Sequence, residues 1–191
     1  MRIERGLPDA LRDQAAELYW EAFGPKLNRV MGPSPRARAF IARAIRADHV
    51  IAATEGAQLL GLAGFKTSQG AFVGGSAREM RRAYGIFGAT WRGVALSMLH
   101  TDVDNERFLI DGLCVDARWR GQGIGTALIA AICHEGARRG YDAVRLDVVD
   151  TNLRARALYE RLGFVAVGSD RLGAAAPLFG FGATVTMVRG L

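Results

Sequence analysis

Apolar and polar residues recur along this chain with the period of a helix in some stretches and of a strand in others. After Pro8, apolar residues return every three or four positions, which predicts a helix that ends at Phe23-Gly24-Pro25. An irregular loop is expected over Lys26–Pro35, where glycine and proline gather. The helical spacing resumes over Pro35–Ala47, and Ser34 is placed to cap this second helix.

Short apolar runs bounded by turn residues predict the strands. These runs are Met1–Arg5, Val50–Thr54, Gln58–Lys66, Phe108–Val115, Ala143–Val149, Phe164–Val167 and Ala183–Val188. The second and third runs flank Glu55-Gly56-Ala57, which indicates a hairpin. Two helices, Ile124–Arg139 and Thr151–Leu162, alternate with the later strands and end at glycines. Strands and helices joined by short connections predict a mixed sheet whose faces are covered by helices.

The stretch Gly70–Glu106 fits this alternation less well. Ser76 is placed to cap a helix that runs through Arg82, and Gly85–His100 is apolar around Trp91. Glycines within the stretch lower its helix propensity. Because the segment is too apolar to lie free in solvent, we expect one or two helices there rather than a linker.

Composition narrows the class of protein without identifying its chemistry. A length of 191 residues, half of them apolar, indicates a globular domain with a sizeable core. The net charge of +6 comes mostly from arginine, since lysine occurs only at Lys26 and Lys66. The sequence contains no basic run with interleaved aromatic residues of the kind that binds nucleic acid. It also contains no uninterrupted apolar stretch long enough to predict a membrane span. Cys114 and Cys133 fall on a predicted strand and helix, and with no signal-peptide pattern they favour a reducing cytoplasm.

The turn between the strand Phe108–Val115 and the following helix is the first candidate for chemistry. It reads Arg120-Gly121-Gln122-Gly123-Ile124-Gly125-Thr126. Glycine lets a ligand come close to the backbone, and a helix N-terminus leaves N–H groups unpaired where negative charge is favoured. With Arg118 and Arg120 beside it, the turn predicts a phosphate site, although close packing of strand on helix is the alternative. It lacks the lysine of a P-loop, and Thr126 stands where a dinucleotide fingerprint has its third glycine.

Two motifs resemble those of the GCN5-related N-acetyltransferases, the GNAT superfamily. The first is Arg120-x-x-Gly123-x-Gly125, which is similar to the R/Q-x-x-G-x-G/A of that family's coenzyme A pyrophosphate loop. The second begins about thirty residues later and runs from Asn152 to Phe164, where the family has N-x-x-A-x-x-L-Y-x-x-x-G-F. Asn152 and Tyr159 are two helical turns apart and therefore share a face.

The resemblance implies an α/β (α+β) fold. Its central sheet would be mixed, mostly antiparallel and of about seven strands, flanked by helices and splayed between the fourth and fifth strands. Residues 1–191 would form a single domain, with a helical insertion at about 70–106 between strands three and four. The implied activity is that of an acetyl-CoA-dependent N-acetyltransferase. A primary amine of a small molecule or a protein would attack acetyl-CoA directly in a ternary complex, and no metal is implied.

The resemblance also implies roles for individual residues. The residues expected to bind acetyl-CoA are Leu113, Cys114, Val115, Arg118, Arg120, Gly121, Gln122, Gly123, Ile124, Gly125, Thr126, Asn152, Ala155 and Tyr159. Tyr159 would protonate the departing thiolate, and a core tyrosine is the alternative. Asp111 is the first candidate for the general base, because we place it on the strand face of Leu113 and Val115. Glu106 is the second, and Asp111 has a structural alternative as partner of an arginine or a tyrosine.

Three functions are consistent with the sequence. We favour the N-acetyltransferase over a non-catalytic acyl-CoA-binding sensor, because a sensor has no need of a leaving-group acid. A basic nucleic-acid-binding domain is supported by the net charge alone. The stretch Gly70–Glu106 is expected to cover the acceptor side or to form the surface of a homodimer. We expect neither nucleic acid nor membrane as a partner, and a cytoplasmic location.

Overall fold

The computed structural model describes residues 1–97 and 106–191, and within these ranges seven strands form one sheet. The strands are β1 (Arg2–Arg5), β2 (Val50–Glu55), β3 (Gln58–Lys66), β4 (Phe108–Val115), β5 (Ala143–Val149), β6 (Val165–Arg171) and β7 (Ala183–Gly190). Their order in the sheet is β1-β2-β3-β4-β5-β7-β6. Neighbouring strands are antiparallel except β4 and β5, which are parallel. The mixed, mostly antiparallel sheet expected from the sequence is confirmed.

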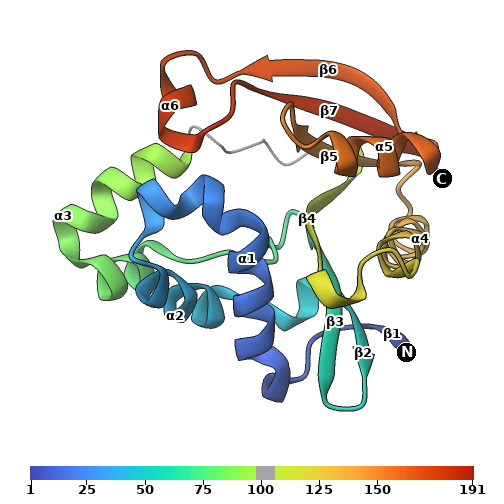
Figure 1. Ribbon diagram of the computed structural model, residues 1–191, viewed down its shortest axis with the longest axis horizontal. Coiled ribbons are helices and arrows are strands. Elements are labelled where there is room, and N and C mark those ends of the chain that lie inside the picture. Colours follow the sequence, from blue (N-terminus) through green and yellow to red (C-terminus); the bar gives the residue numbers. More distant parts are fainter. Residues whose placement is uncertain (98–105) are drawn as a thin grey trace.

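Helices cover both faces of this sheet. They are α1 (Arg12–Met31), α2 (Ser34–Ala44), α3 (Ala77–Ser97), α4 (Ile124–Arg138), α5 (Leu153–Arg161) and α6 (Ala176–Phe179). Figure 1 shows α1, α2 and α3 on one side of the sheet and α4 on the other. A hydrophobic core lies on each side, and the free thiols of Cys114 and Cys133 are buried, one in each core. Of the helices in residues 1–97 and 106–191, none is both long enough and apolar enough to cross a membrane.

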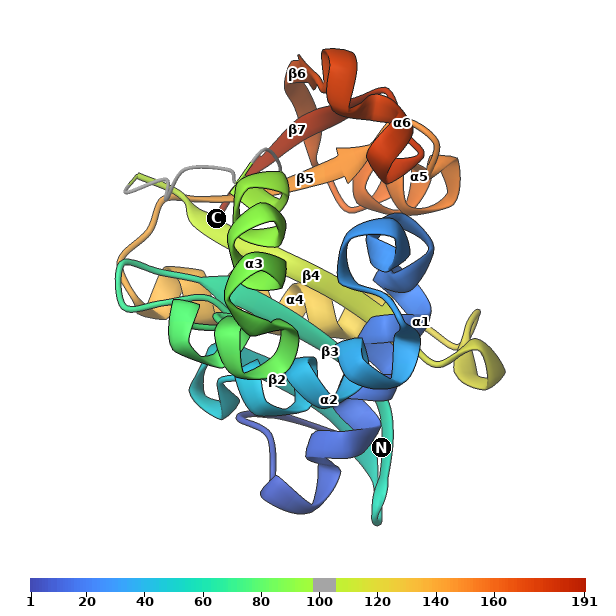
Figure 2. The ribbon, with the colours of Figure 1, turned by 90° about the vertical axis from the view of Figure 1, so that its left-hand side faces the viewer.

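The sheet is splayed between β4 and β5, as the resemblance implied. Phe108, Leu109 and Ile110 pair with Val144, Arg145 and Leu146 at the start of the two strands. Figure 2 shows β4 and β5 diverging beyond this point. The carboxyl-terminal half of β4 therefore has β3 on one edge and an opening on the other.

The predicted end of the first helix at Gly24 and Pro25 is wrong, because α1 contains Pro25 and continues to Met31. A proline inside a helix costs about 3 kcal/mol, since it removes a hydrogen bond and crowds the preceding turn. The next turn carries Val30 and Met31, which are buried at 0% and 4% exposure. Burying such side chains contributes about 1.5–3 kcal/mol each, enough to offset the proline. The loop expected over Lys26–Pro35 is thus helical in its first part.

The second helix begins without the predicted side-chain cap. Ser34 is the first residue of α2, and Pro33 occupies the N-cap with extended backbone and no side-chain hydrogen bond. The helix ends at Ala44 rather than Ala47, because Ile45 is extended and pairs with Val73 in an isolated bridge. The interpretation of Ser34 as the cap is therefore wrong.

The stretch between β3 and β4 is helical, in agreement with the sequence. The backbone N–H of Ser76 donates to Oε2 of Glu79 (2.7 Å), and the backbone N–H of Glu79 donates to Oγ of Ser76 (3.2 Å). This reciprocal pair is a capping box, so the predicted capping role of Ser76 is confirmed. Gly85 then adopts φ 72° and ψ 175°, which divides α3 into two helical segments. The predicted end of the second segment, with Met98 and Leu99, lies outside the described residues.

Candidate functional site

β4 bulges at Asp111, beside the point where it leaves β5. The register of β4 against β3 shifts by one residue there, and such a shift redirects side chains. Leu113 and Val115 pack against the core on the α4 side. Asp111 instead accepts the backbone N–H of Phe72 through Oδ2 (3.2 Å), and Phe72 lies in the α1-side core. The expectation that Asp111 shares a strand face with Leu113 and Val115 is therefore wrong.

The glycine turn leads into α4 with two residues in the left-handed region. Gly121 has φ 81° and Gly123 has φ 80°, values that favour glycine. A Cβ added at either residue would meet no atom within 4 Å, so the space beside the turn is open. Gly123 is the N-cap of α4 and supplies no side chain to cap it. The first N–H groups of the helix are therefore presented to a ligand in this space.

A cavity of about 490 Å³ is lined by this turn together with the end of β4 and the start of α5. Most of the predicted cofactor-binding residues lie around it. Those that line it are Leu113, Cys114, Val115, Arg120, Gly121, Gly123, Ile124, Gly125, Thr126, Asn152 and Ala155. Segments about thirty residues apart in the sequence thus meet at one cavity, as the resemblance implied.

The positive charge at this cavity differs from the prediction. Arg120 lines it, and its Nε donates to the carbonyl of Val115 (3.0 Å). Arg118 instead pairs with Asp116, Nη2 to Oδ2 at 2.6 Å, and this hydrogen bonding holds the pKa of Asp116 below its usual value. Neither Arg118 nor Gln122 is among the residues that line the cavity.

A second cavity, of about 320 Å³, continues from the first into the opening between β4 and β5. The two cavities share Leu113, Asn152, Ala155 and Leu158. Asn152 is the N-cap of α5, where its Oδ1 accepts the backbone N–H of Ala155 (3.2 Å). Tyr159 lines the second cavity beside Asn152 and Ala155. The helical face predicted for Asn152 and Tyr159 is therefore confirmed.

Tyr159 is buried, and its ring lies 5.9 Å from that of Phe164. Burial, with a smaller contribution from the nearby Cys114, raises the pKa of Tyr159 to about 12. A phenol with such a pKa stays protonated at neutral pH and is a hydrogen-bond donor. Tyr19 lines the same cavity, and burial together with the charge of Asp111 raises its pKa as well.

A third cavity, of about 400 Å³, lies on the α1 side of the sheet. Its walls are largely apolar and come from α1, α2 and α3, for instance Met31, Phe40 and Met80. Two carboxylates, Asp111 and Asp147, line both the third and the second cavity, as do Tyr19, Leu27 and Ile110. The second cavity thus adjoins both the first and the third at the splayed sheet, and we refer to the three together as the cavity path.

A family model described as the acetyltransferase (GNAT) family matches residues 12–164, which is more than half of the chain. The chain belongs to this family. The match contains the glycine turn, the bulge in β4 and the helix that carries Asn152 and Tyr159. The recognition made from the two motifs is therefore confirmed.

Known proteins extend this assignment to the fold. The human N-acetyltransferase 8B is 35% identical over 81 residues, which are 42% of this chain and 30% of that relative. The aligned segments span less than half the length of each of the curated relatives. The crystal structure of an N-acetyltransferase from Staphylococcus aureus Mu50 superposes with a TM-score of 0.72 at 14% identity, over 99% of this chain and 100% of that one. An acetyltransferase from Bacillus anthracis str. Ames, solved in complex with acetyl coenzyme A, gives 0.51 at 17% identity, over 74% of this chain and 61% of that one.

Glu106, the second candidate for the base, lies elsewhere in this GNAT protein. It is exposed and lines a separate hollow with Arg107, Arg139 and Tyr141. It lines none of the three connected cavities. The structure therefore brings Asp111 to the candidate site and leaves Glu106 outside it.

Sequence reasoning missed several polar residues that line the path, including Asp147 at the junction of the second and third cavities and Lys66 at the third. Arg154 and Arg161 line the first cavity, and Tyr19 and Lys26 line the second. Arg154 and Arg161 are seven residues apart on α5, so their shared face was available as a signal. Tyr19 has the spacing of a core residue, and Lys26 falls in the predicted loop, so neither pattern marked them.

Proposed function

We propose that this GNAT protein transfers an acetyl group from acetyl-CoA to a primary amine of a small molecule or a protein. The transfer takes place by direct attack in a ternary complex. The observation that supports this most strongly is the series of three adjoining cavities, with a phosphate-type turn at the first, carboxylates at the junction of the second and third, and largely apolar walls around the third. Donor and acceptor therefore approach the second cavity from opposite ends.

The first cavity fits the diphosphate part of coenzyme A. Open space beside Gly121 and Gly123 admits phosphate oxygens close to the backbone, and the N-terminus of α4 favours negative charge. Arg120 lies at this cavity, and Arg154 and Arg161 line its α5 side. The predicted contribution of Arg118 is weaker, because its guanidinium is already paired with Asp116.

The second cavity fits the pantetheine arm and the thioester. β5 pairs with β4 as far as Ile110, so the edge of β4 at Leu113–Val115 is available to the arm. Backbone N–H groups on such an edge stabilise the oxyanion that forms on the thioester carbonyl. The small side chain of Ala155 leaves room on this helix face for the narrow arm. The amide of Asn152 lines the same cavity.

Tyr159 and Asp111 complete the chemistry of the second cavity. The Tyr159 hydroxyl, protonated at neutral pH, gives its proton to the departing thiolate. Asp111 receives a proton from the attacking amine, directly or through water. The Phe72 N–H donates to Oδ2 of Asp111 and orients the carboxylate.

The third cavity supports an amine acceptor with an apolar body. Asp111 and Asp147 are acidic side chains where the third cavity adjoins the second, and although Asp147 is also paired with Arg145 (3.4 Å), this acidic junction favours an ammonium group. The apolar walls from α1, α2 and α3 suit a hydrocarbon or aromatic portion behind it. That neither nucleic acid nor a membrane is a partner, and that the protein is cytoplasmic, remain predictions from the sequence.

An acceptor screen tests the proposal. The protein is incubated with acetyl-CoA and with amines, antibiotics, amino acids or peptides, and the released CoA thiol is measured. We expect thiol release with a subset of amines and none in a Gly123→Asp variant. Tight acetyl-CoA binding without thiol release for any amine would favour the alternative function, a non-catalytic acyl-CoA sensor.

A further inference from the structure

Lys26 lines the second cavity, where the acetyl group would be transferred. It does so because α1 continues through Pro25 and brings the next turn over the splayed strands. Leu113, Asn152 and Tyr159 line the same cavity. The mechanism described above gives Lys26 no role.

Burial of Lys26 favours an uncharged amine, whereas the Phe23 ring and the carboxylates of Asp111 and Asp147, which line the same cavity, favour the ammonium form. The side chain is half-buried, with Nζ 5.9 Å from the centre of the Phe23 ring, and that ring covers Gly112 of β4. Burial lowers the pKa of Lys26, and the interaction with Cys114 of β4 opposes this in part. A lysine whose pKa is lowered holds a larger fraction of the nucleophilic free base near neutral pH.

We propose that Lys26 is itself an acetyl acceptor, modified by acetyl-CoA bound to the same chain when no amine substrate fills the path. The proposal rests on the proposed function, because it uses the same donor site. Lys26 and Leu113 line the second cavity, and Asp111 and Asp147 line it where it adjoins the third cavity, from which the acceptor enters. An amine substrate bound at Asp111 and Asp147 therefore shields the thioester from Lys26.

The reaction is an ordinary aminolysis of a thioester. The lysine first releases one proton to solvent and becomes the free base. Its Nζ lone pair forms a bond to the acetyl carbonyl carbon, the carbon–sulfur bond breaks, and sulfur departs with the electron pair. The nitrogen loses a second proton to Asp111 or water, and Tyr159 protonates the thiolate. The products are acetyl-lysine, CoA thiol and one net proton, so no other reactant is needed.

The modification is expected to slow the enzyme. Acetylation removes the positive charge of Lys26 and adds an acetyl group to a cavity of about 320 Å³. The acceptor then meets a narrower path to Leu113. Acetylation of Lys26 would thus let the enzyme limit its own turnover. Its extent would depend on the ratio of acetyl-CoA to amine substrate.

The chain provides matched controls for this proposal. Lys66, the other lysine, lines the third cavity but is not among the residues that line the second. The amino group of Met1 pairs with Glu55 (3.1 Å) at the β1 edge of the sheet. The lowered pKa of Lys26 would also favour its acetylation by free acetyl-CoA in solution, but that reaction does not depend on the glycine turn, so the Gly123→Asp variant distinguishes it from transfer by bound acetyl-CoA.

The test is intact-mass and peptide mass spectrometry after incubation with acetyl-CoA and no amine substrate. We expect one acetyl group at Lys26, formed at least about tenfold faster than at Lys66, because the donor is held beside it. The Lys66→Arg variant keeps the label, and the Lys26→Arg and Gly123→Asp variants lose it. Urea-unfolded protein is expected to show no preference between the two lysines. Equal labelling of both lysines in the folded protein, or a label on Cys114, would overturn the proposal.

Titration calorimetry with acetyl-CoA separates this proposal from the proposed function. If acetyl-CoA binds and an amine from the screen is acetylated, but Lys26 is not, the self-acetylation is wrong and the enzyme assignment stands. If the folded protein binds no acetyl-CoA, both are wrong. A lower rate of substrate acetylation after preincubation with acetyl-CoA, absent in Lys26→Arg, would support the self-limiting role.

Discussion

The two ends of the cavity path are built differently. The first cavity is formed mainly by two segments, the end of β4 with the glycine turn after it and α5 with its N-cap, and its phosphate-type end consists of backbone N–H groups and glycine with arginine side chains beside them. The third is formed by side chains from α1, α2, β3, the segment 71–75, α3, β4 and β5. Backbone recognition tolerates most substitutions except those that block the turn. Side-chain recognition changes with each wall residue, so one end can stay fixed while the other varies.

The largest effect, on acetyl-CoA binding, is expected when the glycine turn of the first cavity is blocked. Gly123→Asp places a carboxylate in the space proposed for phosphate and forces a side chain onto φ 80°. We expect acetyl-CoA binding to be abolished in titration calorimetry. Gly56→Asp is the matched control, since Gly56 has φ 57°, also has open space around it, and lies in the β2–β3 turn. Unchanged affinity in a folded Gly123→Asp protein would refute the phosphate assignment.

The next effect concerns the middle of the path. Tyr159→Phe removes the proposed acid and leaves the ring in place, so kcat should fall by about 10²-fold or more. Acetyl-CoA affinity should change little, because the glycine turn is untouched. Tyr141→Phe is the control, because Tyr141 lies at the separate hollow near Glu106. A normal kcat in Tyr159→Phe would mean that the hydroxyl is not the acid and that Tyr159 serves only in packing.

Asp111→Asn tests the carboxylate at the junction of the second and third cavities. As the base, Asp111 should impose an acidic limb on the pH profile of kcat/KM, with activity rising as the carboxyl loses its proton. The variant should lack that limb and be about tenfold or more slower at its optimum. The amide oxygen of asparagine is still able to accept the Phe72 N–H, so the fold is expected to persist. If the limb remains, the base is another group or the amine arrives uncharged.

How far the sequence predicts this molecule depends on how local each feature is. The turn at Gly121 and Gly123 and the pair Asn152 and Tyr159 each lie within a short segment, so spacing alone indicated their arrangement. The continuation of α1 through Pro25 depends on the burial of Val30 and Met31 by distant segments, which local propensity does not register.

Asp111 illustrates a second reason for error, and Arg118 shows a contact that the sequence prediction did not take into account. The bulge arises from the pairing of β4 with β3, between Gly64 and Phe65, and a single strand's alternation contains no sign of it. Arg118 was predicted from charge beside a phosphate-type turn, and the sequence does place Asp116 two residues before it. An ion pair between Arg118 and Asp116 is therefore an alternative to a phosphate contact that the sequence alone already allows.

At the third cavity, a substitution is expected to have a smaller effect, limited to the KM for the amine. Ala71 lines the third cavity and is half-buried, so Ala71→Phe should fill part of that cavity without opening the core. The KM for the amine should rise by about tenfold, with acetyl-CoA affinity unchanged. Ala77→Phe is the control, because Ala77 is exposed at the start of α3 and does not line the cavity. An equal change in both substrates' constants would mean that the two ends are not independent.

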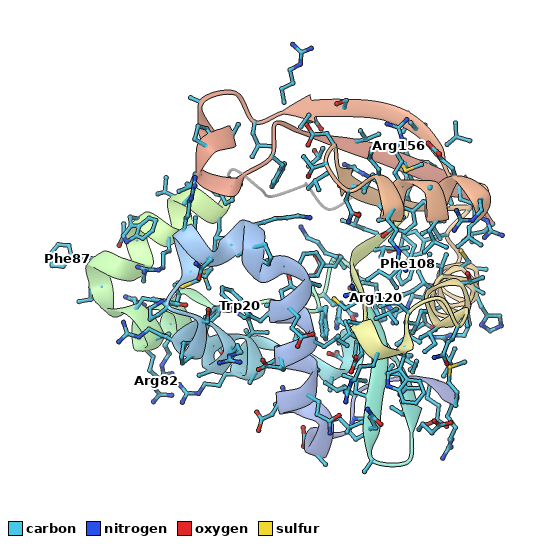
Figure 3. All side chains as sticks on the ribbon, in the orientation of Figure 1. Trp20, Arg82, Phe87, Phe108, Arg120 and Arg156 are labelled. Atoms are coloured by element: carbon cyan, nitrogen blue, oxygen red, sulfur yellow. The ribbon has the colours of Figure 1, made fainter. Side chains whose placement is uncertain are left out.

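The smallest catalytic effect is expected on the outer face of α3. Met80 lines the third cavity, whereas Phe87 is 91% exposed and points away from the protein (Figure 3). Phe87→Ser should therefore leave kcat and both KM values unchanged, in contrast to Ala71→Phe. The homodimer predicted from the apolar character of this stretch is tested by light scattering on the same variant. Because Ile86 and Val94 are also exposed, a dimer formed through this face should fall to the monomer mass when Phe87 becomes polar. A change in turnover without a change in mass would mean that the outer face acts on the acceptor end from a distance, and that α3 does not divide into a catalytic and an external side.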